Sequence, residues 1–179
     1  VSGTHLVDPQ PARMVLVGDL IYFIESSLGS SPIVYTLWKL DPLSNTKTKV
    51  KTFTENYSVD FYLFSIDGAL YLVHDQVDTL SLWKSNDAIS DLSLVKTIPG
   101  QRSSDGSAFR SVIGDGRGNI YFTIRDYYTN IYALWRSDGT ESGTILLKND
   151  QHDLPKWSTA NGLLLFSDRE AAHGEELWT

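Results

Sequence analysis

Short apolar runs separated by turn residues recur along the whole chain. Four of these runs are four residues long, and a turn containing Gly, Asp or Asn precedes each of them; they occupy residues 20–23, 69–72, 119–122 and 163–166. The runs are rich in Ile, Leu, Tyr and Phe and are too short for helices, so each predicts a β-strand. Consecutive rather than alternate positions are apolar, which predicts that neighbours cover both faces of each strand.

A Leu-Trp pair follows each of these runs and marks a repeat. The pairs lie at residues 37–38, 82–83, 134–135 and 177–178, at intervals of 45, 52 and 43 residues. Another apolar run precedes each turn, and a run ending in Lys or Thr follows each of the first three pairs. The unit is therefore four short strands in roughly 47 residues, which is the size of a propeller blade. We expect the recurring Trp side chains to pack between neighbouring sheets.

This pattern predicts a single all-β domain over residues 1–179, a β-propeller of four four-stranded antiparallel blades. The repeats span approximately residues 12–54, 60–100, 109–150, and 156–179 together with 1–9. The last repeat stops at Thr179, before its fourth strand, and residues 1–7 resemble residues 141–147. We therefore expect the N-terminal strand to close the last blade and to pair its edge. The alternative is a four-blade excerpt of a larger propeller.

The charge balance narrows the classes of partner. The chain has 15 Lys and Arg against 22 Asp and Glu, which gives a formal net charge of -7 at pH 7. Such an acidic surface repels phosphate backbones and anionic lipids, so we expect neither nucleic-acid binding nor membrane insertion. The chain has no Cys, which excludes disulfides and thiolate metal sites.

The third and fourth repeats carry a more specific motif. Residues 134–144 read Leu-Trp-Arg-Ser-Asp-Gly-Thr-Glu-Ser-Gly-Thr, and residues 176–178 read Glu-Leu-Trp. These segments resemble the bacterial repeat family named for its Glu-Leu-Trp-x-x-Asp-Gly-Thr (ELWxxDGT) motif. The resemblance implies a secreted or cell-surface bacterial protein with a propeller-like fold, and it implies no reaction. The first two repeats depart from the motif, because neither Trp38 nor Trp83 is followed by Asp-Gly-Thr.

Residues capable of metal binding are scattered along the chain. The four histidines are His5, His74, His152 and His173. No two of them stand at the spacing of metal ligands on one strand or helix, so we expect no metal cofactor. Calcium is the one ion left open, because residues 105–107 and 115–119 partly resemble calcium-binding loops. The Asp-Gly-Thr segment is expected to be structural, since Asp-Gly favours hairpin turns.

The loops that join the second and third strands of each repeat are the expected binding surface. By the symmetry of the repeat, residues 25–35, 74–79, 125–130 and 168–175 emerge on one face of the molecule. They are the least alike segments of the repeat, as expected where a rigid scaffold carries variable function. The candidate binding residues in these loops are Tyr35, His74, Arg125, Tyr127, Tyr128, Arg169 and His173.

These observations favour a non-catalytic extracellular module that binds a protein partner or joins a larger extracellular assembly. Tyr side chains suit such a surface, because they offer a flat apolar face and a hydroxyl. Two alternatives stay open at this stage. A carbohydrate-binding module would use the same loops for a glycan. A polysaccharide-acting enzyme would need two paired carboxylates from the acidic residues in or near these loops, which are Asp126, Asp168, Glu170, Glu175 and Glu176.

Overall fold

Four separate antiparallel sheets make up the computed structural model, which describes residues 13–27, 29, 31–86, 90–99, 108–151, 156–170 and 174–179. Sheet 1 consists of β1 (Met14–Val17), β2 (Leu20–Ser26), β3 (Ile33–Asp41) and β4 (Thr46–Glu55). Sheet 2 consists of β5 (Asp60–Ile66), β6 (Ala69–Asp75), β7 (Thr79–Ser85) and β8 (Leu92–Pro99). Sheet 3 consists of β9 (Phe109–Gly114), β10 (Ile120–Arg125), β11 (Tyr132–Ser137) and β12 (Ile145–Gln151). Sheet 4 consists of β13 (Trp157–Ala160), β14 (Leu163–Glu170) and β15 (Gly174–Trp178).

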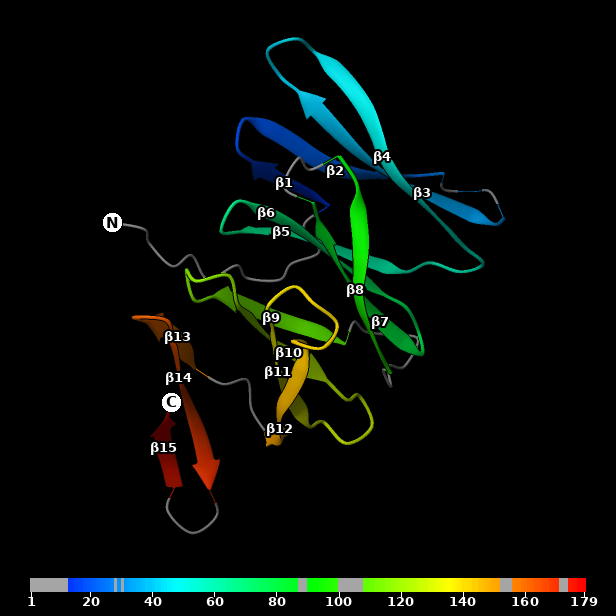
Figure 1. Cartoon of the computed structure of the whole chain (residues 1–179). Helices are drawn as coiled ribbons and strands as arrows, with labels where there is room; N and C mark the ends of the chain where they lie inside the picture. Colours follow the sequence, from blue (N-terminus) through cyan, green and yellow to red (C-terminus); the bar gives the residue numbers. More distant parts are fainter. Residues whose placement is uncertain are drawn as a thin grey trace.

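Each sheet is a meander in which consecutive strands are hydrogen-bonded neighbours. The sheets follow one another as a fan from β1–β4 to β13–β15 (Figure 1). The predictions of an all-β fold and of strands in antiparallel groups are confirmed, and the described residues contain no helix. The described sheets do not close into a ring. Residues 1–9, expected to supply the fourth strand of sheet 4, lie outside the described residues.

Two-residue turns join the first and second strands of sheets 2 and 4. Asp67 and Gly68 have φ of 52° and 77°, and Asn161 and Gly162 have φ of 53° and 75°. Positive φ at both central residues is the requirement of a type I′ turn, whose twist matches that of the two strands. Asp and Asn tolerate this left-handed conformation better than other side chains, and Gly has no side chain to clash. These dipeptides therefore end one strand and begin the next.

Three hydrophobic cores lie between successive sheets. Tyr22 of sheet 1 shares a core with Leu70 and Leu72 of sheet 2. Tyr71 of sheet 2 shares the next core with Phe122 of sheet 3, and the third core joins sheets 3 and 4. Consecutive residues of β6 therefore pack into the cores on opposite faces of sheet 2. This explains why consecutive positions of the strand are apolar. Each fully buried Leu or Phe contributes roughly 1.5–3 kcal/mol to folding.

The Trp residues of sheets 2 and 3 confirm the prediction that they pack between sheets. Trp83 packs against the core between sheets 1 and 2, and Trp135 packs against the core between sheets 2 and 3. Lysines from the preceding sheet cover two of the indole rings. The Nζ atom of Lys51 lies 4.6 Å from the Trp83 ring centroid, and that of Lys148 lies 4.7 Å from the Trp178 centroid. Each cation–π contact stabilises the stack by roughly 0.5–1 kcal/mol.

A buried carboxylate fastens sheet 2 to sheet 3. Asp75, at the end of β6, is fully buried. Its Oδ2 atom accepts hydrogen bonds from the backbone N–H groups of Ala108 at 2.8 Å and Phe109 at 3.1 Å. A buried charge is costly unless it is hydrogen-bonded. The two bonds therefore stabilise the carboxylate and hold the start of β9 against the end of β6.

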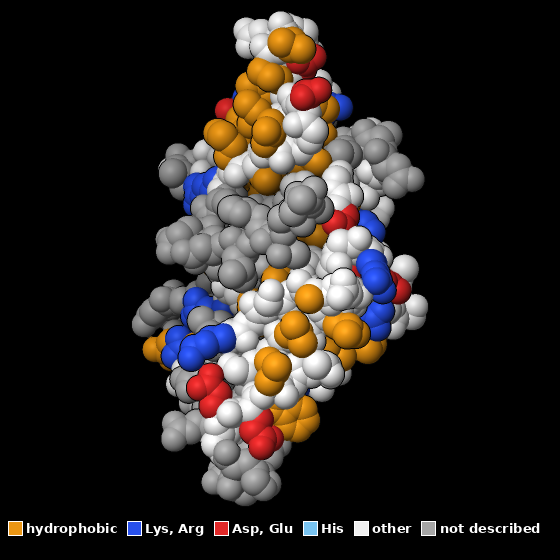
Figure 2. All heavy atoms as spheres, turned by 90° about the vertical axis from the view of Figure 1, so that its left-hand side faces the viewer, with side chains coloured by type: hydrophobic (Ala, Val, Ile, Leu, Met, Phe, Trp, Pro, Cys, Tyr) orange, Lys and Arg blue, Asp and Glu red, His pale blue; other side chains and the backbone are white. Residues whose placement is uncertain are grey.

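The two end faces of the stack expose apolar side chains. On sheet 1, Met14 and Leu16 of β1 are both 62% exposed, and on sheet 4, Leu163 and Leu177 are 57% and 73% exposed. On the side of the molecule that Figure 2 shows, which is the left-hand side of Figure 1, hydrophobic side chains gather in two groups, one above the other. An interior sheet would bury these positions against its neighbours. Each end sheet therefore has one covered face and one face that no other described sheet covers.

Candidate functional site

The loop between β10 and β11 is a tightly hydrogen-bonded turn. The Oδ1 atom of Asp126 accepts hydrogen bonds from the backbone N–H groups of Tyr128 at 2.8 Å and Thr129 at 3.0 Å. The Nε–H group of Arg125 donates to Oδ1 of Asn130 at 2.7 Å. Asp favours this local bonding because its short side chain reaches the backbone two and three residues ahead. The turn thus holds the residues between its ends in one arrangement.

Two tyrosines project from this turn beside a guanidinium. Tyr127 is 41% exposed and Tyr128 is 71% exposed. Their rings meet edge to face, with centroids 5.9 Å apart and planes at 86°. The Arg125 guanidinium carbon lies 5.9 Å from the Tyr127 centroid. We call Arg125, Tyr127 and Tyr128 the aromatic loop; it combines apolar area, two hydroxyls and one positive charge on an exposed surface.

The structure describes the side chains of two other predicted site residues, Tyr35 and His74, and neither belongs to the exposed aromatic loop. Tyr35 and His74 are buried and both pack on Phe61, with ring centroids 4.9 Å and 4.5 Å from it. The Nε2 atom of His74 lies 3.2 Å from a carboxylate oxygen of Glu55. Arg169 lies on β14 opposite Glu175, with its side chain outside the described part, and His173 lies outside the described residues. A binding role for these four residues stays a prediction.

The Asp-Gly-Thr motif of sheet 3 is a hydrogen-bonded turn. The Oδ1 atom of Asp138 accepts hydrogen bonds from the backbone N–H of Thr140 at 2.8 Å and from its hydroxyl at 2.7 Å. The side-chain hydroxyl of Thr140 and then its backbone N–H hold the pKa of the Asp138 carboxyl below its usual value. Lys96 of sheet 2 donates to the Thr144 carbonyl at 2.8 Å. The motif therefore stabilises its own turn and connects sheets 2 and 3.

The loop at residues 115–119, which partly resembles a calcium-binding loop, uses its carboxylate for the turn. Asp115 accepts hydrogen bonds from the backbone N–H groups of Arg117 at 2.8 Å and Asn119 at 3.0 Å. Burial raises the pKa of Asp115, but the hydrogen bonds from Asn119 and Arg117 outweigh it and the net shift is downward. Within the described residues, no three acidic or His side chains are arranged to hold a metal ion. Residues 105–107 lie outside the described residues.

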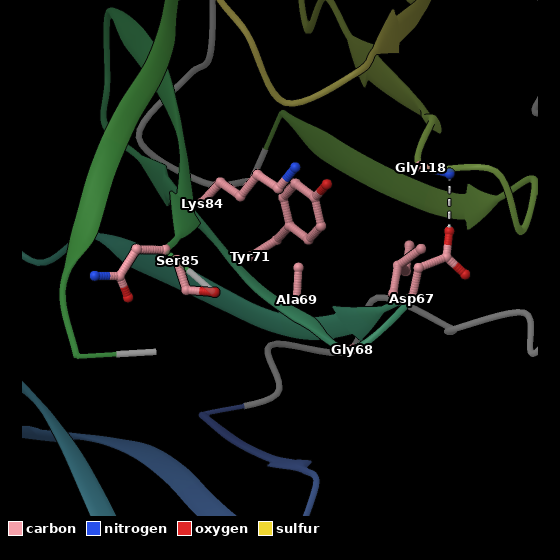
Figure 3. Close-up of a pocket in the computed structure, with 9 residues that line it drawn as sticks. Asp67, Gly68, Ala69, Tyr71, Lys84, Ser85 and Gly118 are labelled. Carbon is pink, nitrogen blue, oxygen red and sulfur yellow. Dashed lines mark hydrogen bonds between the residues drawn. The ribbon is translucent and has the colours of Figure 1, made fainter. Parts of the chain in front are cut away.

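A second candidate site is a cavity of about 280 Å³ between sheets 2 and 3. Its walls come from the β5–β6 turn, the start of β6, the end of β7 and the β9–β10 connection (Figure 3). The lining residues are Ile66, Asp67, Gly68, Ala69, Tyr71, Lys84, Ser85, Asn86 and Gly118. Since β10 runs from this edge towards Arg125, the cavity and the aromatic loop lie at opposite ends of the strands. We call this space the turn-side cavity.

Charges of both signs surround the turn-side cavity. The Lys84 ammonium lies 5.6 Å from the Tyr71 ring centroid, and Asp67 accepts a hydrogen bond from the Gly118 N–H at 3.2 Å. Burial, followed by the negative charges of Asp67 and Asp138, raises the pKa of Tyr71 to about 12. The phenol is therefore neutral at physiological pH. The cavity presents an ammonium, a carboxylate and an aromatic ring within one small space.

Sequence reasoning missed the turn-side cavity because it considered only loops of varied sequence at the other edge. Two of the lining residues are glycines in turns. Gly68 and Gly118 have positive φ, and a Cβ atom at either position would meet no other atom within 4 Å. A Cβ at Gly139 would collide with the Lys84 side chain, so Gly139 lets that side chain extend. The available signal was the clustering of glycines in turns of adjacent sheets.

Comparison with known proteins does not extend these observations. No protein-family model matches the chain, and no curated protein matches it. None of the described residues belongs to a helix long and apolar enough to cross a membrane. The structure itself defines an all-β protein of four antiparallel sheets with cores between successive sheets.

Proposed function

We propose that the four sheets are blades of a β-propeller that closes when the free face of sheet 4 packs on that of sheet 1. Residues 1–9 would add the fourth strand to sheet 4. The support is that each end sheet leaves uncovered a face that the other sheets bury. Sheet 4 exposes the face that sheets 1–3 each turn to the following sheet, and sheet 1 exposes the face that sheets 2–4 each turn to the preceding one. Heterologous faces of this kind close a ring when the rotation between units permits it.

The proposed function is protein recognition by this rigid scaffold, as a non-catalytic module secreted by, or displayed on the surface of, a bacterium. The aromatic loop is the observation that carries the proposal. Tyr and Arg are enriched in protein interfaces and at their energetic centres. Tyr127 and Tyr128 are exposed although apolar burial is favourable, and the Asp126 turn fixes their backbone in advance. Such preorganisation reduces the entropy lost on binding.

A glycan bound by repeated platforms receives less support at this edge. Sheets 1 and 2 have no Tyr pair in the corresponding connections between their second and third strands. A single aromatic cluster on one sheet fits one protein contact better than a repeated sugar site. We therefore place the partner on the aromatic loop of sheet 3.

Site-specific photo-crosslinking tests this proposal. A photoreactive amino acid replaces Tyr128 in the full chain. The chain is then mixed with material from its bacterial source and irradiated. A matched control carries the same group at Tyr57, an exposed tyrosine between β4 and β5. We expect one discrete protein adduct from position 128 that Tyr127→Ala weakens, and none from position 57. Equal adducts from both positions, or none from position 128, would overturn the proposal.

A further inference from the structure

The turn-side cavity is a site independent of the proposed protein partner. It lies at the strand ends opposite the aromatic loop, and the residues that line it come from sheets 2 and 3. Its volume of about 280 Å³ is close to the lower end of small-ligand pockets, roughly 300 Å³. The space therefore suits one small ring rather than an extended chain.

An unneutralised ammonium is the first chemical feature of the cavity. Lys84 forms no ion pair with the described residues. Its side chain packs beside Gly139, and its ammonium lies 5.6 Å from the Tyr71 ring centroid. The side chains of Lys84 and Tyr71 lie together on one side of the cavity, and Asp67 lies on the other, directed towards Gly118 (Figure 3). Hydrogen-bond donors and acceptors therefore face a ligand from opposite walls.

The mixture of charges selects against simple ions. An anion that paired with Lys84 would also meet the field of Asp67 and Asp138, the same field that acts on the Tyr71 phenol. A cation that paired with Asp67 would be repelled by the Lys84 ammonium. A neutral polyhydroxyl ligand avoids both penalties, because each hydroxyl donates to a carboxylate and accepts from an ammonium. The Tyr71 ring supplies the apolar wall that the C–H face of a sugar requires.

We propose that the turn-side cavity binds one neutral pyranose unit, held by Lys84 and Asp67 against Tyr71. Ser85 and Asn86 lie at the end of β7 and complete the polar wall. The Ser85 hydroxyl accepts a hydrogen bond from the Leu70 N–H at 3.0 Å. The proposed site does not depend on the aromatic loop.

Amide chemical-shift titration of the full isotope-labelled chain tests the proposal. The probes are methyl α-D-glucopyranoside, methyl β-D-galactopyranoside and N-acetylglucosamine, with sodium acetate and methylamine as ionic controls. We expect at least one sugar to saturate with a Kd of roughly millimolar strength. The shifts are expected at Gly68, Asn86 and Gly118, and the ionic controls should neither saturate nor compete.

Two site variants and one matched control separate binding from folding. Lys84→Met should weaken sugar binding by about tenfold or more, because a hydrogen-bonded group is lost from a built site. Lys39→Met is the matched control, since Lys39 follows the Trp of sheet 1 at the corresponding position, and it should leave binding unchanged. Asp67→Asn keeps a residue that tolerates the positive φ of the turn and should still weaken binding. Failure of all three sugars to saturate, or equal effects of Lys84→Met and Lys39→Met, would overturn the proposal.

Discussion

Leu82 and Leu177 occupy corresponding positions, each directly before the Trp of the third strand of its sheet, yet their surroundings are opposite. Leu82 is 0% exposed in the core between sheets 2 and 3, whereas Leu177 is 73% exposed. The two leucines have similar local sequences and the same strand register, because the Trp after each pairs with the second strand of its sheet: Trp83 with Leu72 and Trp178 with Phe166. The difference is the following sheet, which covers Leu82 and has no described counterpart beyond sheet 4. In this stack, burial depends on the neighbouring sheet more than on the residue.

Sheet 1 shows the same contrast on its opposite face. Met14 of β1 pairs with Phe23, as Leu63 of β5 pairs with Leu72 and Val112 of β9 pairs with Phe122. Leu63 and Val112 are buried against the preceding sheet, but Met14 is exposed. The exposed faces of sheets 1 and 4 are therefore faces that each interior sheet buries against its neighbours.

The largest expected effect on the free energy of unfolding is at Leu82, which the following sheet covers. Leu82→Ala should lower the free energy of unfolding by about 2–5 kcal/mol, because it leaves a cavity in a close-packed core. Urea unfolding of the variant and the parent chain measures the change. Leu43→Ala is the control, since Leu43 is fully solvated in the β3–β4 connection, and its expected change is below about 0.5 kcal/mol. Equal effects at Leu82 and Leu43 would contradict the core assignment.

The same truncation at the exposed position tests ring closure. If sheet 1 covers sheet 4 as we propose, Leu177→Ala should lower the free energy of unfolding by about 1–2 kcal/mol. A free face instead predicts a change below about 0.5 kcal/mol. Urea unfolding at two protein concentrations measures this, because closure within one molecule makes the effect independent of concentration. A change near zero, or one that grows with concentration, argues against closure within one chain.

The smallest expected effect concerns Tyr71 of sheet 2, which faces sheet 3. Tyr71 has its pKa raised from 10.0 to about 12 by burial and then by Asp67 and Asp138. The neutral phenol is therefore favoured in the folded chain, and its stabilisation is complete below pH 10 and is lost as the pH rises through about 12. Because solvent partly screens this group, the expected loss in the free energy of unfolding is only on the order of 1 kcal/mol.

Tyr71→Phe isolates this contribution. The variant should show a smaller loss of stability between pH 10 and pH 12 than the parent chain, as measured by urea unfolding at each pH. Phenolate absorbance should show one late-titrating tyrosine fewer. The corresponding residue of sheet 4 is Leu165, so the last sheet contributes no such titration. An unchanged pH dependence would show that Tyr71 does not titrate in this window.

Much of the local structure could be predicted from the residues alone. The apolar runs at 20–23 and 69–72 lie in the second strands of their sheets, and the dipeptide Asp67-Gly68 forms the turn between β5 and β6. These features depend on backbone preferences and on contacts between near neighbours in the chain. The candidate site was predicted less completely. Tyr127 and Tyr128 are exposed on a hydrogen-bonded turn, whereas Tyr35 and His74, which the sequence assigned to the same class of loop, lie buried on β3 and β6.

The amino-acid sequence by itself determined the all-β character of this protein, the positions of its turns and the association of Trp with inter-sheet packing. Only the tertiary structure decided which faces are covered, why Leu82 is buried while Leu177 is exposed, and where a cavity lies beside Lys84. The physical reason is range. Strand and turn formation depend on residues a few positions apart, whereas burial and cavities depend on how sheets about 45 residues apart in the chain pack together.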